Sequence, residues 1–205
     1  MSNVYAYPHE EGLYINMTNR CTFHCVFCLR DSRKAFEGHE LWLDREPTAE
    51  ETLEAIAAAL AQKNYKEIVF CGFGEPTMRL DALLAVARGI KERWNLPVRL
   101  NTNGQGSLVA GRDIAPDLKG LVDTVSISLN APTAKEYAAV SRPAHGEAAY
   151  RAMLDFASAC KAQGIDVVMT VVDSIGTEQV ERSRKVAEGL GVRFRVREYI
   201  PEEKQ

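Results

Sequence analysis

Residues 13–28 read Leu-Tyr-Ile-Asn-Met-Thr-Asn-Arg-Cys-Thr-Phe-His-Cys-Val-Phe-Cys, and they join an apolar run to a group of thiols. The run at 13–17 predicts a buried strand, and Cys21, Cys25 and Cys28 follow in the loop after it. Three of the five cysteines thus fall within eight residues, in a C-x3-C-x2-C spacing. An odd number of cysteines crowded this closely is not typical of a disulfide framework. The stretch therefore predicts a thiolate site for a metal or cluster at the end of a strand.

Outward from this stretch, short β-branched runs alternate with longer helical patterns. Strands are predicted at 13–17, 67–71, 98–102, 124–129, 166–172 and 192–198, and the main helices at 48–62, 80–93, 147–163 and 177–190. Such alternation predicts parallel strands joined by right-handed crossovers. Six units of about 30 residues use most of the chain, whereas a complete eight-fold barrel typically needs about 250 residues. We expect an α/β fold, an incomplete (β/α)6 TIM-type barrel in one domain over 1–205, with a doubly wound open sheet as the alternative.

Charge and hydropathy narrow the class of protein further. The 25 basic and 28 acidic residues give a net charge of −3, which argues against a general nucleic-acid binder. No apolar run approaches the roughly 20 residues that span a bilayer, and the N-terminal segment lacks the form of a signal peptide. We therefore expect a cytoplasmic protein with reduced thiols and no membrane partner.

The thiol spacing favours a particular kind of cluster site. Three thiolates can hold three irons of a [4Fe–4S] cluster and leave the fourth iron open, whereas a cluster for electron transfer takes four cysteines. An open iron can bind a ligand and direct chemistry at it. A zinc knuckle is the alternative for the same three thiolates. Cys71, at the end of the second strand, is either a small buried side chain or a fourth ligand.

A second motif follows the second predicted strand, as Gly72-Phe73-Gly74-Glu75-Pro76. Glycine lets a backbone approach a ligand closely, and a carboxylate with carbonyl oxygens can accept hydrogen bonds from an ammonium group. A turn of this kind standing alone would be interpreted as a tight strand-to-helix connection. One βα unit after the cysteine loop, it lies on the same rim of the expected barrel.

Together these two motifs resemble the radical S-adenosylmethionine (radical SAM) superfamily. The resemblance implies a [4Fe–4S] cluster on Cys21, Cys25 and Cys28, with SAM bound at the open iron and cleaved reductively to methionine and a 5′-deoxyadenosyl radical. It places Phe27 near the adenine, and the 72–75 turn, including Glu75, at the methionine ammonium. Phe73 departs from the commoner Gly-Gly-Glu-Pro form.

Polar residues end the later strands, where the active rim of such folds lies. They are Asn101, Asn103, Ser126, Ser128 and Asn130. By the same resemblance they match positions that contact the SAM ribose and carboxylate; turn formation is the alternative. In the last strand Arg193, Arg195 and Arg197 share one face. Arg197, nearest the rim, is the candidate ligand for a SAM carboxylate or a substrate anion, while edge-strand charge explains Arg193.

Over most of its length the chain resembles the small radical SAM proteins associated with TatD-type nucleases, a resemblance that names no substrate. The predicted activity is hydrogen abstraction from an unknown substrate, with an electron donor such as flavodoxin or ferredoxin. A glycyl-radical-enzyme activase is one alternative, and a non-enzymatic iron–sulfur sensor or electron carrier is another. Because six units leave a barrel open, we expect a bulky substrate or a protein partner. The segment 30–46, with Arg30 and Trp42, is either a lid or docking face, or a solvated loop with one packed indole.

Overall fold

A seven-stranded sheet lies at the centre of the computed structural model, which describes residues 3–33 and 35–200. Its strands follow the order β1-β2-β5-β6-β7-β8-β9. They span Ala6–His9 (β1), Gly12–Ile15 (β2), Glu67–Phe70 (β5), Val98–Thr102 (β6), Thr124–Ser128 (β7), Asp166–Val172 (β8) and Arg193–Arg197 (β9). A separate antiparallel hairpin joins β3 (Ala35–Phe36) to β4 (His39–Glu40).

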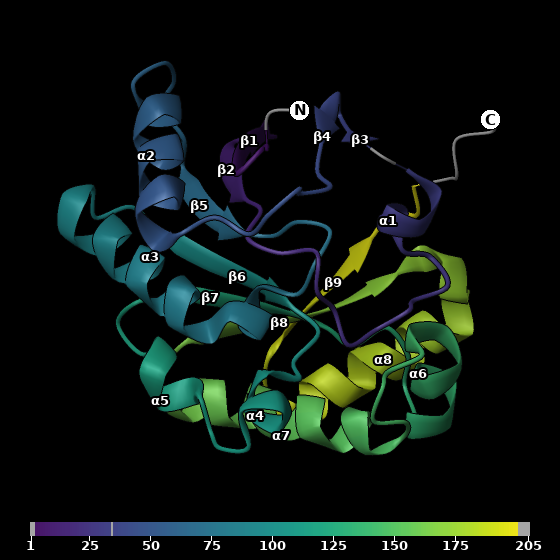
Figure 1. Cartoon of the computed structure of the whole chain (residues 1–205). Coiled ribbons are helices and arrows are strands. Elements are labelled where there is room, and N and C mark those ends of the chain that lie inside the picture. The colour runs from purple at the N-terminus through teal and green to yellow at the C-terminus, as the bar shows by residue number, and fades with distance from the viewer. Residues whose placement is uncertain (1–2, 34, 201–205) are drawn as a thin grey trace.

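Helices connect the strands and cover one side of the sheet (Figure 1). They span Leu29–Ser32 (α1), Ala49–Leu60 (α2), Leu80–Arg93 (α3), Gly106–Ala110 (α4), Ala115–Leu118 (α5), Ala134–Ser141 (α6), Ala148–Ala162 (α7) and Thr177–Leu190 (α8), with short 3₁₀ turns at Pro76–Arg79 (η1) and Asp173–Ile175 (η2). Within the seven-stranded sheet, pairing is parallel from β2 to β9 and antiparallel between β1 and β2. The six parallel strands in chain order confirm the predicted incomplete (β/α)6 fold.

Side chains alternate between the two faces of the sheet, as strand geometry requires. Residues such as Ile15, Phe70 and Leu100 belong to the main core, together with Ile56 of α2 and Phe156 of α7. The opposite face, called the inner face below, carries Tyr14 and Val69, which pack in a second cluster with Tyr7, Leu41 and Phe73. The helices therefore bury one face of the sheet, and the inner face remains for a site.

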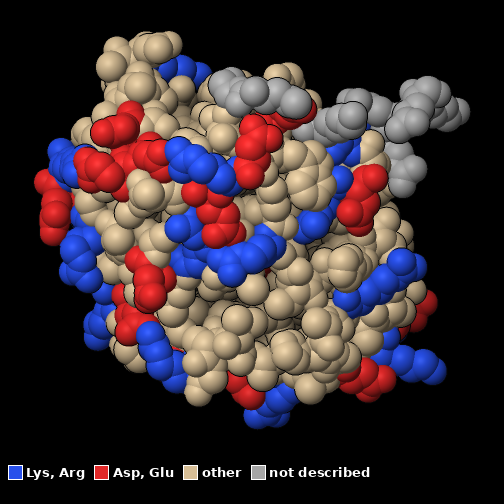
Figure 2. Space-filling model, in the orientation of Figure 1, with Lys and Arg blue, Asp and Glu red and all other residues tan. Residues whose placement is uncertain are grey.

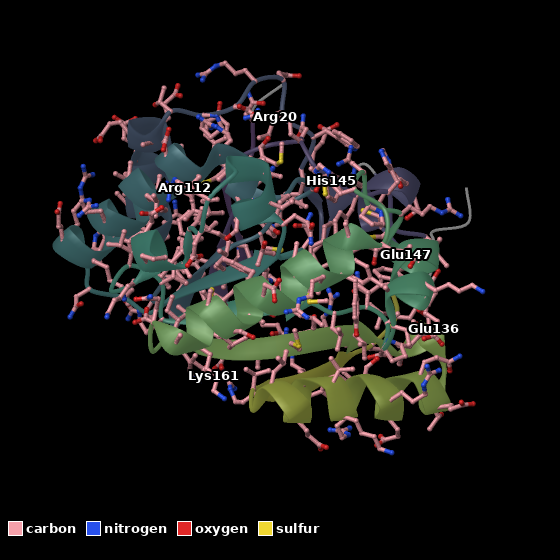
Figure 3. All side chains as sticks on the ribbon, turned by 90° about the horizontal axis from the view of Figure 1, so that it is seen from below. Arg20, Arg112, Glu136, His145, Glu147 and Lys161 are labelled. Carbon is pink, nitrogen blue, oxygen red and sulfur yellow. The ribbon has the colours of Figure 1, made fainter. Side chains whose placement is uncertain are left out.

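Local signals explain where the helices begin and how they are fastened. Thr48 caps α2 in a capping box with Glu51, as the sequence predicts. On the outer side, Glu136 of α6 pairs with Arg182 of α8 at 2.8 Å (Figure 3). Figure 2 shows basic and acidic side chains interspersed over one face of the molecule. Within the described residues, no helix has the length and apolar character to cross a membrane.

Candidate active site

The cysteine loop, residues 16–28, is fastened to the connection between α6 and α7. Phe23 forms an isolated antiparallel bridge with Pro143. The backbone N–H of Val26 donates to the carbonyl of Val140 at 2.9 Å. Figure 3 labels His145 in this connection. These two contacts hold the cysteine loop against the end of α6 and the residues that follow it, which fixes the positions of the three thiols.

The thiols of Cys21, Cys25 and Cys28 are free and half-buried. Burial raises the pKa of Cys21 to about 11, and the charge of Glu75 adds to that rise. Burial raises the pKa of Cys25 to about 12, with Cys28 and Cys21 contributing. Burial also raises the pKa of Cys28. Because metal ligation needs thiolates, cluster binding here must release protons.

The donor set fits an iron–sulfur cluster. Across residues 3–33 and 35–200, no three His, Cys, Asp or Glu side chains converge tightly enough to hold a single metal ion. The thiols of Cys28 and Cys21 nevertheless raise the pKa of Cys25, and the thiol of Cys28 raises that of Cys21. Three thiolates can hold three irons of a [4Fe–4S] cluster, whereas a structural zinc site takes four protein ligands.

The Gly72–Glu75 turn is pressed against the start of the cysteine loop. A Cβ on Gly74 would lie 2.2 Å from the carbonyl oxygen of Thr18, and one on Gly72 would lie 2.2 Å from Oδ1 of Asn16. The backbone N–H of Glu75 donates to the carbonyl of Arg20 at 2.8 Å. The two motifs that the sequence brings to the same rim are therefore in direct backbone contact, and this contact is what requires glycine.

The carboxylate of Glu75 is 4% exposed and is engaged by the protein's own donors. Its Oε1 accepts hydrogen bonds from the backbone N–H and the hydroxyl of Thr77, at 3.1 and 2.7 Å, and from the hydroxyl of Thr102 at 2.8 Å. Its Oε2 accepts one from the backbone N–H of Asn103 at 2.7 Å. Burial raises the pKa of Glu75, and these hydrogen bonds oppose the rise. In this structure the side chain holds the turn against the end of β6. This structural role is additional to the predicted contact with the methionine ammonium.

Asn103 links this brace to the cluster ligands. Its Nδ2 lies 3.9 Å from Sγ of Cys21 and donates to the hydroxyl of Thr22 at 3.3 Å. Its Oδ1 accepts the backbone N–H of Gln105 at 3.0 Å. The structure thus brings together Cys21, Glu75 and Asn103, three residues that the sequence predicted from separate motifs.

The remaining predicted residues on β6 and β7 lie along the inner face. Asn101 pairs in register with Ser126, and Ser128 pairs with Thr170 of β8. Since residues paired across neighbouring strands point to the same side, these polar groups form one strip across the sheet. Asn101 also accepts a hydrogen bond from Arg99 at 3.3 Å. The strip lies on the face opposite the helices, as a ligand site requires.

Asn130 and Phe27 have different surroundings. Asn130 is 1% exposed, has a φ of 58° and donates through Nδ2 to the hydroxyl of Ser141 at 3.0 Å. It therefore stabilises the turn after β7 and the end of α6, and no open surface reaches it. Phe27 is half-buried between Cys25 and Cys28 in the loop, and its contact with an adenine stays a prediction.

Arg197 lies at the far edge of the same face, at the end of β9. Burial lowers the pKa of its guanidinium, while the thiols of Cys71 and Cys25 oppose that shift. Its Nε is buried without a hydrogen-bond partner in the described part of the chain. Burial raises the pKa of Cys71, and Asn101 opposes that rise. The guanidinium therefore faces the thiol-bearing end of the inner face.

A comparison with protein families decides what this arrangement belongs to. The model of the Radical SAM superfamily matches residues 15–187, which include both motifs and most of the sheet. The chain belongs to the radical SAM superfamily. It is accordingly an enzyme of the kind that uses a [4Fe–4S] cluster and SAM.

Individual proteins are also similar to this chain, some in sequence and some in fold. A protein of Saccharolobus solfataricus named "Probable GTP 3′,8-cyclase" is 34% identical over 123 residues, 59% of this chain and 35% of the relative. The chain thus matches about a third of the length of these curated relatives. Streptococcus suis SuiB bound to S-adenosylmethionine has a TM-score of 0.66 at 16% identity, covering 94% of this chain and 39% of that one. A radical SAM methyltransferase from Sphaerobacter thermophilus has a TM-score of 0.61 at 15% identity, covering 94% and 68%. These structures share the radical SAM fold.

The segment after the cysteines folds onto the site of this radical SAM chain. Arg30 donates to the carbonyls of Asn19 and Phe73, at 3.1 and 3.4 Å. Its guanidinium lies 5.0 Å from the centre of the Trp42 ring, and that ring packs edge-on against Phe73 at 5.6 Å. Phe73, which replaces a glycine of the commoner motif, therefore provides the surface on which the indole packs. Trp42 is still 37% exposed, so both the lid and the packed-indole interpretations stay predictions.

Sequence reasoning missed the residues that support the motifs. Thr77 and Thr102 hold Glu75, and Asn16 donates to the carbonyl of Leu41 at 2.8 Å beside Gly72. Thr77 has a local signal, since it follows the Glu-Pro pair and Glu75 caps η1 through it. Thr102 and Asn16 act across 27 and 25 residues, and no local pattern marks such contacts.

Proposed function

We propose that this protein cleaves SAM reductively and directs the resulting radical at a substrate on the inner face of the sheet. The observation that supports the proposal is the connection of Glu75 and Asn103 to Cys21, which joins the SAM-type turn to the cluster loop. When bound, the cluster supplies the electron that splits SAM into methionine and a 5′-deoxyadenosyl radical. The radical then abstracts a hydrogen atom from the substrate.

In this proposal the chain's own residues bind the cluster, bind SAM and enclose the radical. Cys21, Cys25 and Cys28 ligate three irons, and the backbone of Gly72 and Gly74 meets the methionine end of SAM. The strip of Asn101, Ser126 and Ser128 provides hydrogen-bonding groups for the ribose, with Phe27 at the adenine. Enclosure of the radical from water is the remaining task, and Trp42 on its Arg30 and Phe73 support is placed to contribute to it.

The electron enters from an external donor such as flavodoxin or ferredoxin. The substrate is bulky or part of a protein, because the sheet is open, with β1 and β9 at its edges. An open sheet leaves room for a large substrate on its inner face. A glycyl-radical-enzyme activase is the alternative: it would cleave SAM in the same way and abstract the hydrogen atom from a partner protein. GTP is the first small molecule to test, since it appears in the names of the curated relatives.

The experiment is transfer of deuterium. Reconstituted, reduced enzyme is incubated anaerobically with SAM and a deuterated candidate substrate, or with fractions of deuterated cell extract. Mass spectrometry of 5′-deoxyadenosine then reports hydrogen abstraction as a mass increase of one unit. If 5′-deoxyadenosine forms but never acquires deuterium from any substrate or fraction, hydrogen abstraction is the wrong step.

A further inference from the structure

Strand β9 places three arginines on the inner face of the sheet. Arg195 pairs in register with Thr170, and Arg197 pairs with Val172. Phe194 points the other way, where it packs against the main core and under the guanidinium of Arg184 at 4.8 Å. Since side chains alternate along a strand, Arg193, Arg195 and Arg197 all project from the face that carries the polar strip.

Within the part of the chain that the structure describes, one of these three arginines has an acidic partner. Arg193, at the start of β9, donates through Nε to Asp166 at 3.0 Å in a two-pronged ion pair. In residues 3–33 and 35–200, no hydrogen bond or ion pair engages the guanidinium of Arg195 or Arg197. Charge on an edge strand discourages pairing with other chains, which accounts for exposed groups. It does not account for Arg197, whose Nε is fully shielded from solvent.

Shielding the Nε of an unpaired guanidinium is costly, because burial removes water from a charge without replacing it, even though Arg197 as a whole is only half-buried. Arg195 adds to that cost, since its like charge on the same face lowers the pKa of Arg197 further. The thiols of Cys71 and Cys25 lie near enough to affect Arg197. The position thus lacks an anion and adjoins the cluster loop.

We propose that Arg195 and Arg197 form a subsite for an oxyanion group of the substrate, a phosphate or a carboxylate, beside the polar strip of the inner face. The proposal rests on the proposed function, because it assigns a chemical class to the substrate of the same site. Arg197 provides the shielded donor, and Arg195 provides a second, solvent-accessible one. Each guanidinium donates two parallel hydrogen bonds in a geometry that fits two oxygens of a carboxylate or a phosphate.

The source of this anion is the substrate or SAM, whose methionine end carries a carboxylate. Four strand steps separate β9 from β5, whose end carries the Gly72–Glu75 turn, yet Arg197 lies near enough to Cys71, at that end of β5, to act on its pKa. We assign the anion to the substrate, and the SAM affinity of Arg197→Gln decides between the two sources.

Inorganic pyrophosphate and succinate serve as the phosphate and carboxylate probes, added to reconstituted enzyme holding SAM. Calorimetry measures their binding to wild type, Arg197→Gln, Arg195→Gln and the control Arg193→Gln. We expect at least one probe to bind, and Arg197→Gln to weaken it about 10- to 100-fold, the size of one charge-assisted hydrogen bond. Arg193→Gln leaves that affinity unchanged within about twofold. Which probe binds identifies the anion.

SAM affinity and slow 5′-deoxyadenosine formation without substrate are measured on the same preparations. We expect the control Arg193→Gln to match wild type in both. Loss of SAM affinity in Arg197→Gln would reassign the residue to SAM and overturn the inference, as would equal probe affinity in Arg197→Gln and wild type, or no probe binding to wild type. Wild type that binds a probe but forms no 5′-deoxyadenosine with any reductant refutes the proposed function and leaves the anion subsite in place.

Discussion

Replacing Gly74 by alanine tests the contact between the two motifs. Gly74 is not among the glycines with positive φ, so its importance here comes from close approach alone. The added Cβ would lie 2.2 Å from the carbonyl oxygen and 2.7 Å from the carbonyl carbon of Thr18, and 2.8 Å from the carbonyl oxygen of Arg20. All three neighbours are backbone atoms, which cannot rotate away as the end of a side chain can.

The size of the effect follows from these distances. Ordinary contacts of a Cβ begin near 3.4 Å, so one of the two backbones must move by about 1 Å. Overpacking of this kind typically costs about 1–3 kcal/mol. For a chain of this size, each kcal/mol lowers the unfolding temperature by about 2–4 °C. We therefore expect Gly74→Ala to unfold about 2–12 °C below wild type.

The assay combines stability with cluster loading. Thermal unfolding of the metal-free protein, followed by circular dichroism, reports the packing cost, and iron per chain after reconstitution reports displacement of the cysteine loop. Gly189→Ala is the matched control, because its Cβ meets nothing within 4 Å in helix α8, and alanine in a helix is favoured by about 0.5–1 kcal/mol. Equal unfolding temperatures and equal iron content in Gly74→Ala and wild type would refute the reasoning.

Three further substitutions test separate parts of the account. Cys71→Ala should retain the iron and sulfide content of wild type, whereas a lost cluster would make Cys71 a ligand. Glu75→Gln places an amide N–H₂ against donors from Thr102 and its neighbours, so urea denaturation should show a loss of about 1–3 kcal/mol; an unchanged midpoint would contradict the bracing role. A hydrogen bond from Arg45 and a weaker effect of the Thr48 backbone N–H lower the pKa of Glu51 to about 2. The stabilising effect of Glu51 is therefore present above the pKa near 4.3 of the unfolded chain and is lost as the pH falls toward 2. Glu51→Gln should therefore differ from wild type in unfolding temperature at pH 6 and match it near pH 2, and a constant difference would exclude this linkage.

Regular elements with strong local signals were predicted closely from the sequence. Strands β6 and β8 and helices α3 and α8 have the predicted bounds, because their apolar periodicity is strong. Gly191 ends α8 with a φ of 62°, as a helix C-terminal glycine should. The two short helices α4 and α5 are separate because Gly111 adopts a left-handed conformation between them.

Strand β1 was not predicted, for identifiable reasons. It has four residues and contains Pro8, which lacks a backbone donor and is usually confined to edge strands. The turn that follows has Glu10 at a φ of 52° in place of the glycine or asparagine expected there. The hairpin of β3 and β4 is shorter still, with two residues in each strand.

The site was predicted in its motifs and not in its connections. Cys21 and Glu75 come from separate motifs, each recognisable alone, but the hydrogen bonds of Asn103 that join them depend on packing across more than 25 residues. Periodicity carries no information about such contacts, and the burial of Asn130 likewise follows from the packing of α6. The single-domain organisation, the cytoplasmic location and the identity of the electron donor stay predictions.

The most direct test of the central claim is cleavage of SAM by anaerobically reconstituted, dithionite-reduced protein. Chromatography with mass spectrometry should detect methionine and 5′-deoxyadenosine in equal amounts, formed slowly without substrate. The variant with Cys21, Cys25 and Cys28 all changed to alanine should form neither and should lack the cluster absorbance. Wild type with a full cluster and bound SAM that yields no 5′-deoxyadenosine under any reductant would contradict the account.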